Sequence, residues 1–418
     1  KMPNQEPKKS YEFFAPKVFI RTFGCQMNVR DSEVICGLLQ RSGYKISDDD
    51  KQADIIIFNT CSVRKHAEDR VWSLIGSYKG SKIIGLVGCM AQNYKDKAFQ
   101  RDANISFVVG PQDIEKIPEI LKRLSKNEIA SSPAFGGAPR NDTSLPSAPR
   151  NDTAIPFLFE RKIWETDSSS RPEEIYHTGF YQEKDHGQVV ISEGCSNFCS
   201  YCVVPYVRGA LRHRKQESIL KEIRQAIDQG VTRITLLGQN VNAYRDNQVN
   251  FTNLLEQINQ FDGLKELDFF TSHPKDATAD LFKAIRDLDK LAKRLHLPLQ
   301  SGSDRILKLM NRGYAAKEYL ALIDSYRKIV KDGSLTTDVI VGFPSETDEE
   351  FKKTCDLVSK VKFNSAYIFK YSARAQTEAV KIGPELSRQD LEGRHKKLLD
   401  LQRGISNKLG NRCKNAKK

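Results

Sequence analysis

The stretch EGCSNFCSYCVVPYVRG (residues 193–209) places three cysteines, Cys195, Cys199 and Cys202, within eight positions. The chain holds nine cysteines in 418 residues, too few for a disulfide scaffold, so this group indicates metal or redox chemistry. A structural zinc site needs four ligands, and the nearest histidine, His213, lies in a run of Arg and Lys that suits it poorly as one. Three thiolates would instead leave one iron of a [4Fe–4S] cluster open to a small molecule. The spacing therefore favours an open iron–sulfur cluster, with a zinc loop as the alternative.

Strand-like and helix-like segments alternate on the carboxyl side of this stretch. The predicted strands are QVVISEGC (188–195), RITLLGQN (233–240), ELDFFTSHP (266–274), RLHLPLQSGS (294–303), LTTDVIVGFP (335–344) and SAYIFKYS (365–372). Apolar residues with helical spacing separate them at 218–230, 251–261, 276–288, 316–329 and 348–361. This alternation predicts a partial parallel (β/α)6 barrel over residues 185–385, followed by a final helix (387–408) in a C-terminal segment, 386–418. The three cysteines follow its first strand, at the end where barrels carry their active sites.

A second α/β unit is predicted over residues 17–125. Its strands are KVFIRTFG (17–24), ADIIIFNT (53–60), SKIIGLVG (81–88) and ISFVVG (105–110), with a helix predicted from Asp31 to Gly43. Strand–helix repetition implies a parallel sheet, whose sites form outside the carboxyl ends of the strands. Cys25, Cys61 and Cys89 each follow one of these strands, whereas Cys36 falls on an apolar helix face and is predicted to belong to the core.

The segment between the two units, residues 126–180, is predicted to be a flexible linker. It contains GGAPRNDTSL (136–145) followed at once by the near-copy PSAPRNDTAI (146–155), rich in Pro, Ser and Asn. The chain as a whole has 66 Lys and Arg against 53 Asp and Glu, a net charge of +13, which suits a polyanionic partner such as RNA. With no apolar run of about 18 residues and no signal-peptide core, we expect no membrane span and a cytoplasmic protein.

The spacing C-x3-C-x2-C, with Tyr201 before the last cysteine, resembles that of the radical S-adenosylmethionine (SAM) superfamily. The amino-terminal motifs TFGCQMNVRDSE, FNTCSVR and GLVGCMAQ, followed by LLGQNVNAY, TSHP, LHLPLQSGSDRIL and DVIVGFPSETDEEF, resemble those of MiaB-type tRNA methylthiotransferases. The resemblance covers residues 17–125 and 185–408, and many separate motifs occur in the same order.

The resemblance implies two [4Fe–4S] clusters and SAM as cofactors. Cys195, Cys199 and Cys202 would hold the cluster whose open iron binds SAM, and Cys25, Cys61 and Cys89 would hold a second cluster that carries the sulfur to be transferred. The residues that it implies for SAM binding are Tyr201, Gly238, Gln239, Asn240, Ser301, Ile340 and Gly342. An alternative for the two glycines is that they only form turns.

The implied reaction adds a methylthio group to C2 of N6-isopentenyladenosine at position 37 of tRNA, using two SAM molecules in turn. The clusters and SAM carry this chemistry, so no side chain is assigned as catalytic. The implied partners are the anticodon stem-loop of tRNA and an electron-donor protein, with the enzyme itself a monomer. A basic run is expected to hold tRNA phosphates, with a merely solvated face as the alternative: Arg208, Arg212, Arg214 and Lys215. His273 is a candidate for positioning substrate, or a loop histidine bonded to backbone.

Two features depart from the family pattern. The small β-rich TRAM domain that normally follows is expected to be absent, since the chain stops soon after LQRGISNKLG (401–410), and YSARAQTEA (371–379) lacks the usual Pro and Gly. Three other functions remain open from the sequence: a methylthiotransferase acting on a ribosomal-protein aspartate, a non-catalytic iron–sulfur protein, and a zinc-dependent nucleic-acid-binding module. Cys355 and Cys413 show no ligand context and receive no role.

Overall fold

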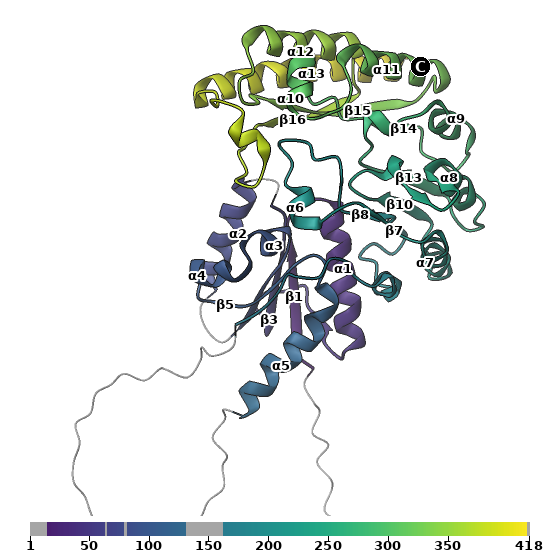
Figure 1. Ribbon diagram of the computed structural model, residues 1–418. Coiled ribbons are helices and arrows are strands. Elements are labelled where there is room, and N and C mark those ends of the chain that lie inside the picture. Colours follow the sequence, from purple (N-terminus) through teal and green to yellow (C-terminus); the bar gives the residue numbers. More distant parts are fainter. Residues whose placement is uncertain (1–14, 63–64, 79–81, 131–161, 416–418) are drawn as a thin grey trace, which may run out of the picture.

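The computed structural model describes residues 15–62, 65–78, 82–130 and 162–415. Its amino-terminal part is a six-stranded parallel sheet with the order β2-β1-β3-β4-β5-β6 (Figure 1). The strands are β1 (Lys17–Thr22), β2 (Lys45–Ile46), β3 (Ile55–Thr60), β4 (Ile83–Gly88), β5 (Ile105–Val109) and β6 (Ile163–Glu165). The parallel sheet that strand–helix repetition predicts is therefore confirmed.

Helices cover both faces of this sheet because successive side chains of a strand point to opposite sides. On β3, Ile55 and Ile57 share a buried cluster with residues of α1 (Gln26–Arg41) and α5 (Ile117–Ala130). Ile56 and Phe58 instead share one with residues of α2, α3 and α4. The latter helices span Lys65–Ser77, Cys89–Tyr94 and Ala98–Arg101. The result is a three-layer α/β/α unit.

The predicted boundaries of this unit need two corrections. Helix α1 begins at Gln26, not at Asp31, because Cys25 is its N-cap and the chain turns into the helix directly after β1. The predicted linker also contains ordered structure: β6 pairs with β5, and the 3-10 helix η3 (Glu173–Thr178) packs against α1. The duplicated APRNDT segment lies outside the described residues.

The carboxyl-terminal part is the predicted six-stranded partial barrel, drawn above the sheet in Figure 1. One three-stranded sheet has the order β13-β10-β7 and another β14-β15-β16, all pairs parallel, and a bridge between Leu267 and Leu291 joins the two. The strands are β7 (His186–Val190), β10 (Arg233–Leu237), β13 (Glu266–Phe269), β14 (Arg294–His296), β15 (Ser334–Val341) and β16 (Ser365–Lys370). All six fall where the sequence predicts strands.

Helices follow the barrel strands, as in other α/β barrels. They are α6 (Val204–Arg208), α7 (Gln216–Asp228), α8 (Phe251–Asn259), α9 (Ala279–Asp287), α10 (Asp304–Leu309), α11 (Ala316–Ile329) and α12 (Asp348–Val361). Two short ribbons complete this part: β8 (Ser192–Glu193) pairs with β9 (Arg212–His213), and β11 (Arg245–Asp246) with β12 (Val249–Asn250). The last helix, α13 (Arg388–Asn415), packs against β16 and α12 and runs past its predicted end at 408. Within the described part of the chain, no helix has the length and apolarity needed to span a membrane.

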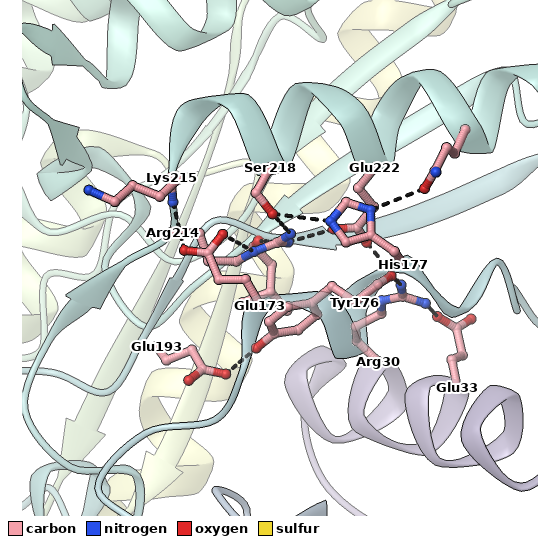
Figure 2. Close-up of polar contacts among 12 residues, drawn as sticks. Arg30, Glu33, Glu173, Tyr176, His177, Glu193, Arg214, Lys215, Ser218 and Glu222 are labelled. Carbon is pink, nitrogen blue, oxygen red and sulfur yellow. Dashed lines mark hydrogen bonds and ion pairs between the residues drawn. The ribbon is translucent and has the colours of Figure 1, made fainter. Parts of the chain in front are cut away.

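Charged side chains are buried where α1 meets the barrel (Figure 2). Arg30 of α1 is fully buried; its Nη2 donates to Glu222 Oε1 of α7 at 2.9 Å and to the carbonyl of Tyr176 at 3.0 Å. Its Nη1 donates to Glu33 Oε2 and to the carbonyl of Phe180, both at 3.0 Å. Arg30 therefore ties the α/β unit, the segment before β7 and the barrel together.

A second arginine completes this contact from the barrel side. Arg214 pairs with the same Glu222, donates to the carbonyl of Val190 at 2.7 Å and stacks 4.1 Å from the ring centre of Tyr176. The hydroxyl of Tyr176 donates to Glu193, two residues before Cys195. Buried contacts through Tyr176 thus connect the interface between α1 and the barrel to the stretch that carries Cys195.

Replacing Arg30 with Ala is expected to lower the free energy of unfolding by about 3 to 5 kcal/mol, because Glu222 and Glu33 lose a buried cation. Denaturant unfolding followed by circular dichroism measures this. Arg41, on the same helix but exposed, donates to the carbonyl of His177, and Arg41→Ala is expected to cost no more than about 1 kcal/mol. Equal losses for the two variants would contradict a structural role for the buried charge.

Candidate functional site

The structure brings Cys25, Cys61 and Cys89 to one edge of the amino-terminal sheet. They follow β1, β3 and β4, which are neighbours in the sheet, and Cys61 and Cys89 come directly after their strands. Burial raises the pKa of the Cys89 thiol, although the nearby Arg208 opposes this effect, and the neighbouring Cys25 adds a smaller increase. The three cysteines therefore share one edge of the sheet, although Cys25 and Cys89 are 64 positions apart in the sequence.

Two glycines permit this close approach. Gly24 has a φ of +133°, and a Cβ placed on it would lie 2.5 Å from Cβ of Cys61. Gly88 has a φ of +91°, and a Cβ there would lie 2.8 Å from the carbonyl oxygen of Thr60. Any larger residue would push the strand ends apart, so glycine immediately before Cys25 and Cys89 is a geometric requirement.

The other cysteines, Cys195, Cys199 and Cys202, lie in the loop between β8 and α6. Backbone bonds fold this loop: Cys202 N–H donates to the carbonyl of Cys199 at 2.9 Å, and Cys195 N–H to that of Gly209 at 3.1 Å. Burial, together with the neighbouring Cys199 and Cys195, raises the pKa of Cys202 to about 12. Thiols in this environment become thiolates only when a metal or a cation stabilises the negative sulfur.

Each group of cysteines has a buried arginine that donates to one sulfur. Nε of Arg208 lies 3.2 Å from Sγ of Cys89, and Nη1 of Arg312 lies 3.3 Å from Sγ of Cys199. Arg312 was not identified from the sequence, and Arg208 was assigned to RNA. In the sequence, Arg312 is a single arginine in the loop after α10, and no motif or spacing distinguishes it from a surface arginine.

The two groups of cysteines lie on segments that pack together. Cys89, which begins α3, shares a small buried cluster with Val203 and Val207. Val203 follows Cys202 directly, and Val207 lies on α6, which contacts α3. The two groups of cysteines are therefore held near each other by direct packing of α3 against α6.

Within the described residues, no group of three or more His, Cys, Asp or Glu side chains is arranged to hold a single metal ion. In a [4Fe–4S] cluster each thiolate binds a different iron, so its sulfur ligands lie farther apart than the ligands of one ion. His213, the histidine considered from the sequence as a fourth zinc ligand, packs edge-on against the ring of Tyr244.

Buried polar atoms collect at the carboxyl ends of the first four barrel strands. The following atoms have no hydrogen-bond partner among the described residues: Ser192 Oγ, Asn240 Oδ1, Ser272 Oγ, His273 Nε2 and Gln300 Oε1. Buried polar groups are normally satisfied, so unpartnered atoms gathered at one barrel rim are suited to bind a polar ligand. Amine, carboxylate and ribose hydroxyl groups, which SAM carries, would satisfy atoms of this kind.

Asn240, which was predicted to bind SAM, and His273, which was predicted either to position substrate or to bond to backbone, each direct an unpartnered polar atom to this place. Asn240 is held by a bond from its Nδ2 to Asp276 Oδ2 at 2.6 Å, which leaves its carbonyl oxygen available. His273 accepts from the N–H of Lys275 through Nδ1, and burial, with the nearby Arg312 and Lys275, lowers its pKa to about 2. Its imidazole is therefore neutral.

The other residues predicted for SAM binding are spread over different roles. Tyr201 and Ile340 belong to one apolar cluster with Met310 and Phe343, and Gln239 is partly exposed beside Asn240. The remaining three, Gly238, Gly342 and Ser301, contact other parts of the protein, which agrees with the alternative that the two glycines only form turns. A Cβ on Gly238 would meet Ser192 Oγ at 2.4 Å, Gly342 N–H donates to Glu346 Oε2 at 2.8 Å, and the Ser301 hydroxyl accepts from Ser303 N–H at 3.2 Å.

The predicted phosphate-binding run needs a correction. Arg208 and Arg214 are only 2% and 3% exposed and pair with Asp31 and Glu222, so they cannot reach a phosphate on the surface. Arg212 is partly buried against Glu193, and Lys215 is 71% exposed in its side chain. Of the four residues, only Arg212 and Lys215 remain candidates for RNA contact.

A cavity of about 180 Å³ lies between the two cysteine segments. Ser62, next to Cys61, and Val203, next to Cys202, both line it, together with residues 373–376 that follow β16. Arg374 enters it, held by Glu68 at 3.4 Å, and its Nε and Nη2 have no partner among the described residues. Glu68 is fixed in turn by the hydroxyl of Ser62 at 2.7 Å. The sequence singled out this loop only for its departure from the family pattern.

Two family models match the chain. The model described as Radical SAM superfamily matches residues 189–358, which contain the barrel cysteines. The model described as Uncharacterized protein family UPF0004 matches residues 17–110, which contain Cys25, Cys61 and Cys89.

Curated relatives match nearly the whole chain. A tRNA-2-methylthio-N(6)-dimethylallyladenosine synthase of Syntrophus aciditrophicus is 40% identical over 383 residues, which cover 88% of this chain and 76% of the relative. The protein of the same name from Thermoanaerobacter pseudethanolicus is 40% identical over 399 residues, covering 93% and 78%. Among solved structures, the radical S-adenosylmethionine methyltransferase TsrM of Kitasatospora setae has a TM-score of 0.57 at 13% identity, covering 88% of this chain and 74% of that one. That likeness concerns the fold.

Proposed function

The chain belongs to the family of tRNA-2-methylthio-N(6)-dimethylallyladenosine synthases, and from this membership we propose that it transfers a methylthio group to C2 of an N6-isopentenylated adenosine in tRNA. It is a radical SAM transferase. The observation that carries the proposal is that one cavity is lined both by Ser62, next to Cys61, and by Val203, next to Cys202, so that a cysteine segment from each matched region borders it. We further propose adenosine 37 in the anticodon loop as the target.

Its cofactors include one [4Fe–4S] cluster and SAM, which the radical SAM family implies. We assign Cys195, Cys199 and Cys202 to that cluster. When bound, the cluster supplies the electron that cleaves SAM, and SAM supplies the methyl group and the group that removes hydrogen from the target carbon. The protein places the cysteines at the barrel rim, where Asn240, Gln300 and other unsatisfied polar atoms would hold the polar groups of SAM.

A second cluster on Cys25, Cys61 and Cys89 is the finer part of the proposal. Support comes from their convergence at one sheet edge, from the glycines that allow it, and from the cation of Arg208 beside Cys89. A buried, positively assisted sulfur environment suits thiolate ligands. The opening between this group and the barrel group would then be the place where sulfur meets the target carbon.

The cavity between Ser62 and Val203 is our proposed site for the target nucleotide. A target base must be unstacked from its neighbours to reach such a site, and the unpartnered Nε and Nη2 of Arg374 would donate to acceptor atoms of that nucleotide. Glu68 fixes the guanidinium, so that its orientation is set before RNA arrives. Arg212 and Lys215 remain to contact phosphates.

Anaerobically reconstituted protein with dithionite and SAM is expected to form the 2-methylthio nucleoside on isopentenylated tRNA, detected by mass spectrometry of the digested RNA. Cys25→Ala is expected to abolish product while SAM cleavage persists, because the barrel cysteines are intact, and to remove about half of the iron and sulfide.

Cys36→Ala is the matched control, since Cys36 is a buried core thiol on α1, and it is expected to keep full iron content and product. Full cluster content and SAM cleavage without any product on isopentenylated tRNA would reject the proposed substrate. Methylthiolation of a ribosomal protein instead would favour the aspartate alternative.

Asn240→Ala is expected to weaken SAM binding about tenfold, or ~1.4 kcal/mol, by removing a preformed buried acceptor. Equilibrium dialysis of labelled SAM against the reconstituted protein measures this. Asn259 is a matched control, because it is also buried and bonded to an aspartate, Asp289 at 2.8 Å, but its carbonyl already accepts from Lys290 N–H. A similar loss in Asn259→Ala would show that the effect is structural.

Arg374→Lys is expected to raise the KM for tRNA about tenfold while SAM binding is unchanged, because lysine keeps the charge beside Glu68 but lacks the unpartnered donors Nε and Nη2 of arginine. Steady-state product formation over a range of tRNA concentrations tests it. Arg101, which donates to Tyr94 at 3.1 Å on the same side of the sheet, provides the control variant Arg101→Lys. An unchanged KM in Arg374→Lys would remove the cavity from the substrate path.

A further inference from the structure

Two arginines stand in matching positions at the two groups of cysteines. Arg208 is 2% exposed and Arg312 is 5% exposed, and each donates an N–H to a single cysteine sulfur, in Cys89 and Cys199 respectively. Fully buried guanidinium groups require an anion nearby. The sulfurs are thus part of the charge balance on both sides.

Arg208 reaches across the domain junction. It is the last residue of α6, six positions after Cys202, yet its Nη2 pairs with Asp31 of α1 at 2.7 Å and its Nε donates to Cys89. Asp31 is also paired with Arg171 at 2.9 Å. Burial by itself raises the pKa of Asp31, but the two arginines together lower it, so the carboxylate stays charged. One short segment therefore carries the barrel cysteines and also a donor for the other group.

Arg312 is held differently. Its Nε donates to the hydroxyl of Tyr314 at 3.1 Å and its Nη2 to the carbonyl of Pro298 at 3.4 Å. Among the described residues, no carboxylate forms an ion pair with it. The anionic partner left for this buried cation is the sulfur of Cys199 and whatever that sulfur binds.

We propose that Arg208 and Arg312 are positioning residues that hold up the reduction potentials of the two clusters, Arg208 that of the Cys25/Cys61/Cys89 cluster and Arg312 that of the Cys195/Cys199/Cys202 cluster. Reduction adds negative charge to a cluster, and hydrogen bonds to its sulfurs stabilise the reduced form. Because each arginine reaches only one group, each potential is set separately. The inference rests on the proposed function in one respect, that both groups hold clusters.

The test titrates each cluster alone. A full-length variant with Cys195, Cys199 and Cys202 changed to Ala retains the amino-terminal cluster, and one with Cys25, Cys61 and Cys89 changed to Ala retains the barrel cluster. Adding Arg208→Gln to the first is expected to shift the one-electron equilibrium toward the oxidised form about tenfold, which is about 59 mV, in a titration followed by electron paramagnetic resonance. Arg312→Gln is expected to do the same in the second.

The crossed combinations provide the specificity test: Arg312→Gln in the first background and Arg208→Gln in the second are expected to leave the potential unchanged. Arg171→Gln is the matched structural control, because Arg171 is equally buried and shares Asp31 but contacts no cysteine sulfur in the described structure. Should Arg208→Gln lose iron, Arg208→Lys, which keeps the charge beside Asp31, carries the titration and is expected to show a smaller shift in the same direction.

Unchanged potentials with full iron content, or the same shift in Arg171→Gln, would overturn the inference. A single-background variant that holds no iron or sulfide would instead count against the two-cluster proposal. The two failures are therefore distinguishable.

Discussion

Negative charge buried between the two halves of the molecule has to be balanced by cations buried beside it, and the rest of the structure depends on that balance. Arg30 and Arg214 share Glu222, while Arg171 and Arg208 share Asp31. Glu222 of the barrel is thus shared by one arginine of the amino-terminal unit and one of the barrel, whereas Asp31 of the amino-terminal unit is paired with two arginines from the barrel or the segment before it. The charges cannot be satisfied within one half alone, so the amino-terminal sheet and the barrel are fixed in one orientation. That orientation sets the opening between the two groups of cysteines.

The sequence predicted the longer helices and strands far better than the short strand β6, its pairing and the start of α1. Buried strands such as IIIFNT and the apolar periodicity of the barrel helices are local signals, and the structure follows them. Strand β6 was missed because three residues, Ile163–Glu165, carry too little pattern to separate them from a linker. Its pairing with β5 depends on tertiary contacts that no short window contains. The start of α1 was misplaced for a similar reason, since a cysteine is an unusual N-cap.

In the candidate site, too, some residues could be assigned from the sequence and others could not. Cysteines at strand ends could be grouped from topology alone, because parallel neighbours end at one edge. The arginines could not be assigned: the run from Arg208 to Lys215 looks uniformly basic in sequence, yet two of its arginines are internal counter-ions. Net charge therefore overstates the surface open to RNA here. Arg208 and Arg312, which donate hydrogen bonds to cysteine sulfurs, lie 104 positions apart in the sequence. Their shared role becomes visible only in the fold, which places each of them beside a cysteine.

Helix α6 links the two groups of cysteines directly. It begins two residues after Cys202, packs Val207 against Cys89 and ends at Arg208, which bonds both Cys89 and Asp31. A displacement of the barrel cysteines would move α6, and with it the donor to Cys89 and the charge balance at Asp31. Buried ion pairs resist such movement, because separating them leaves uncompensated charge. The short, buried link through α6 therefore holds the two groups of cysteines at a fixed separation, as the proposed two-cluster chemistry requires.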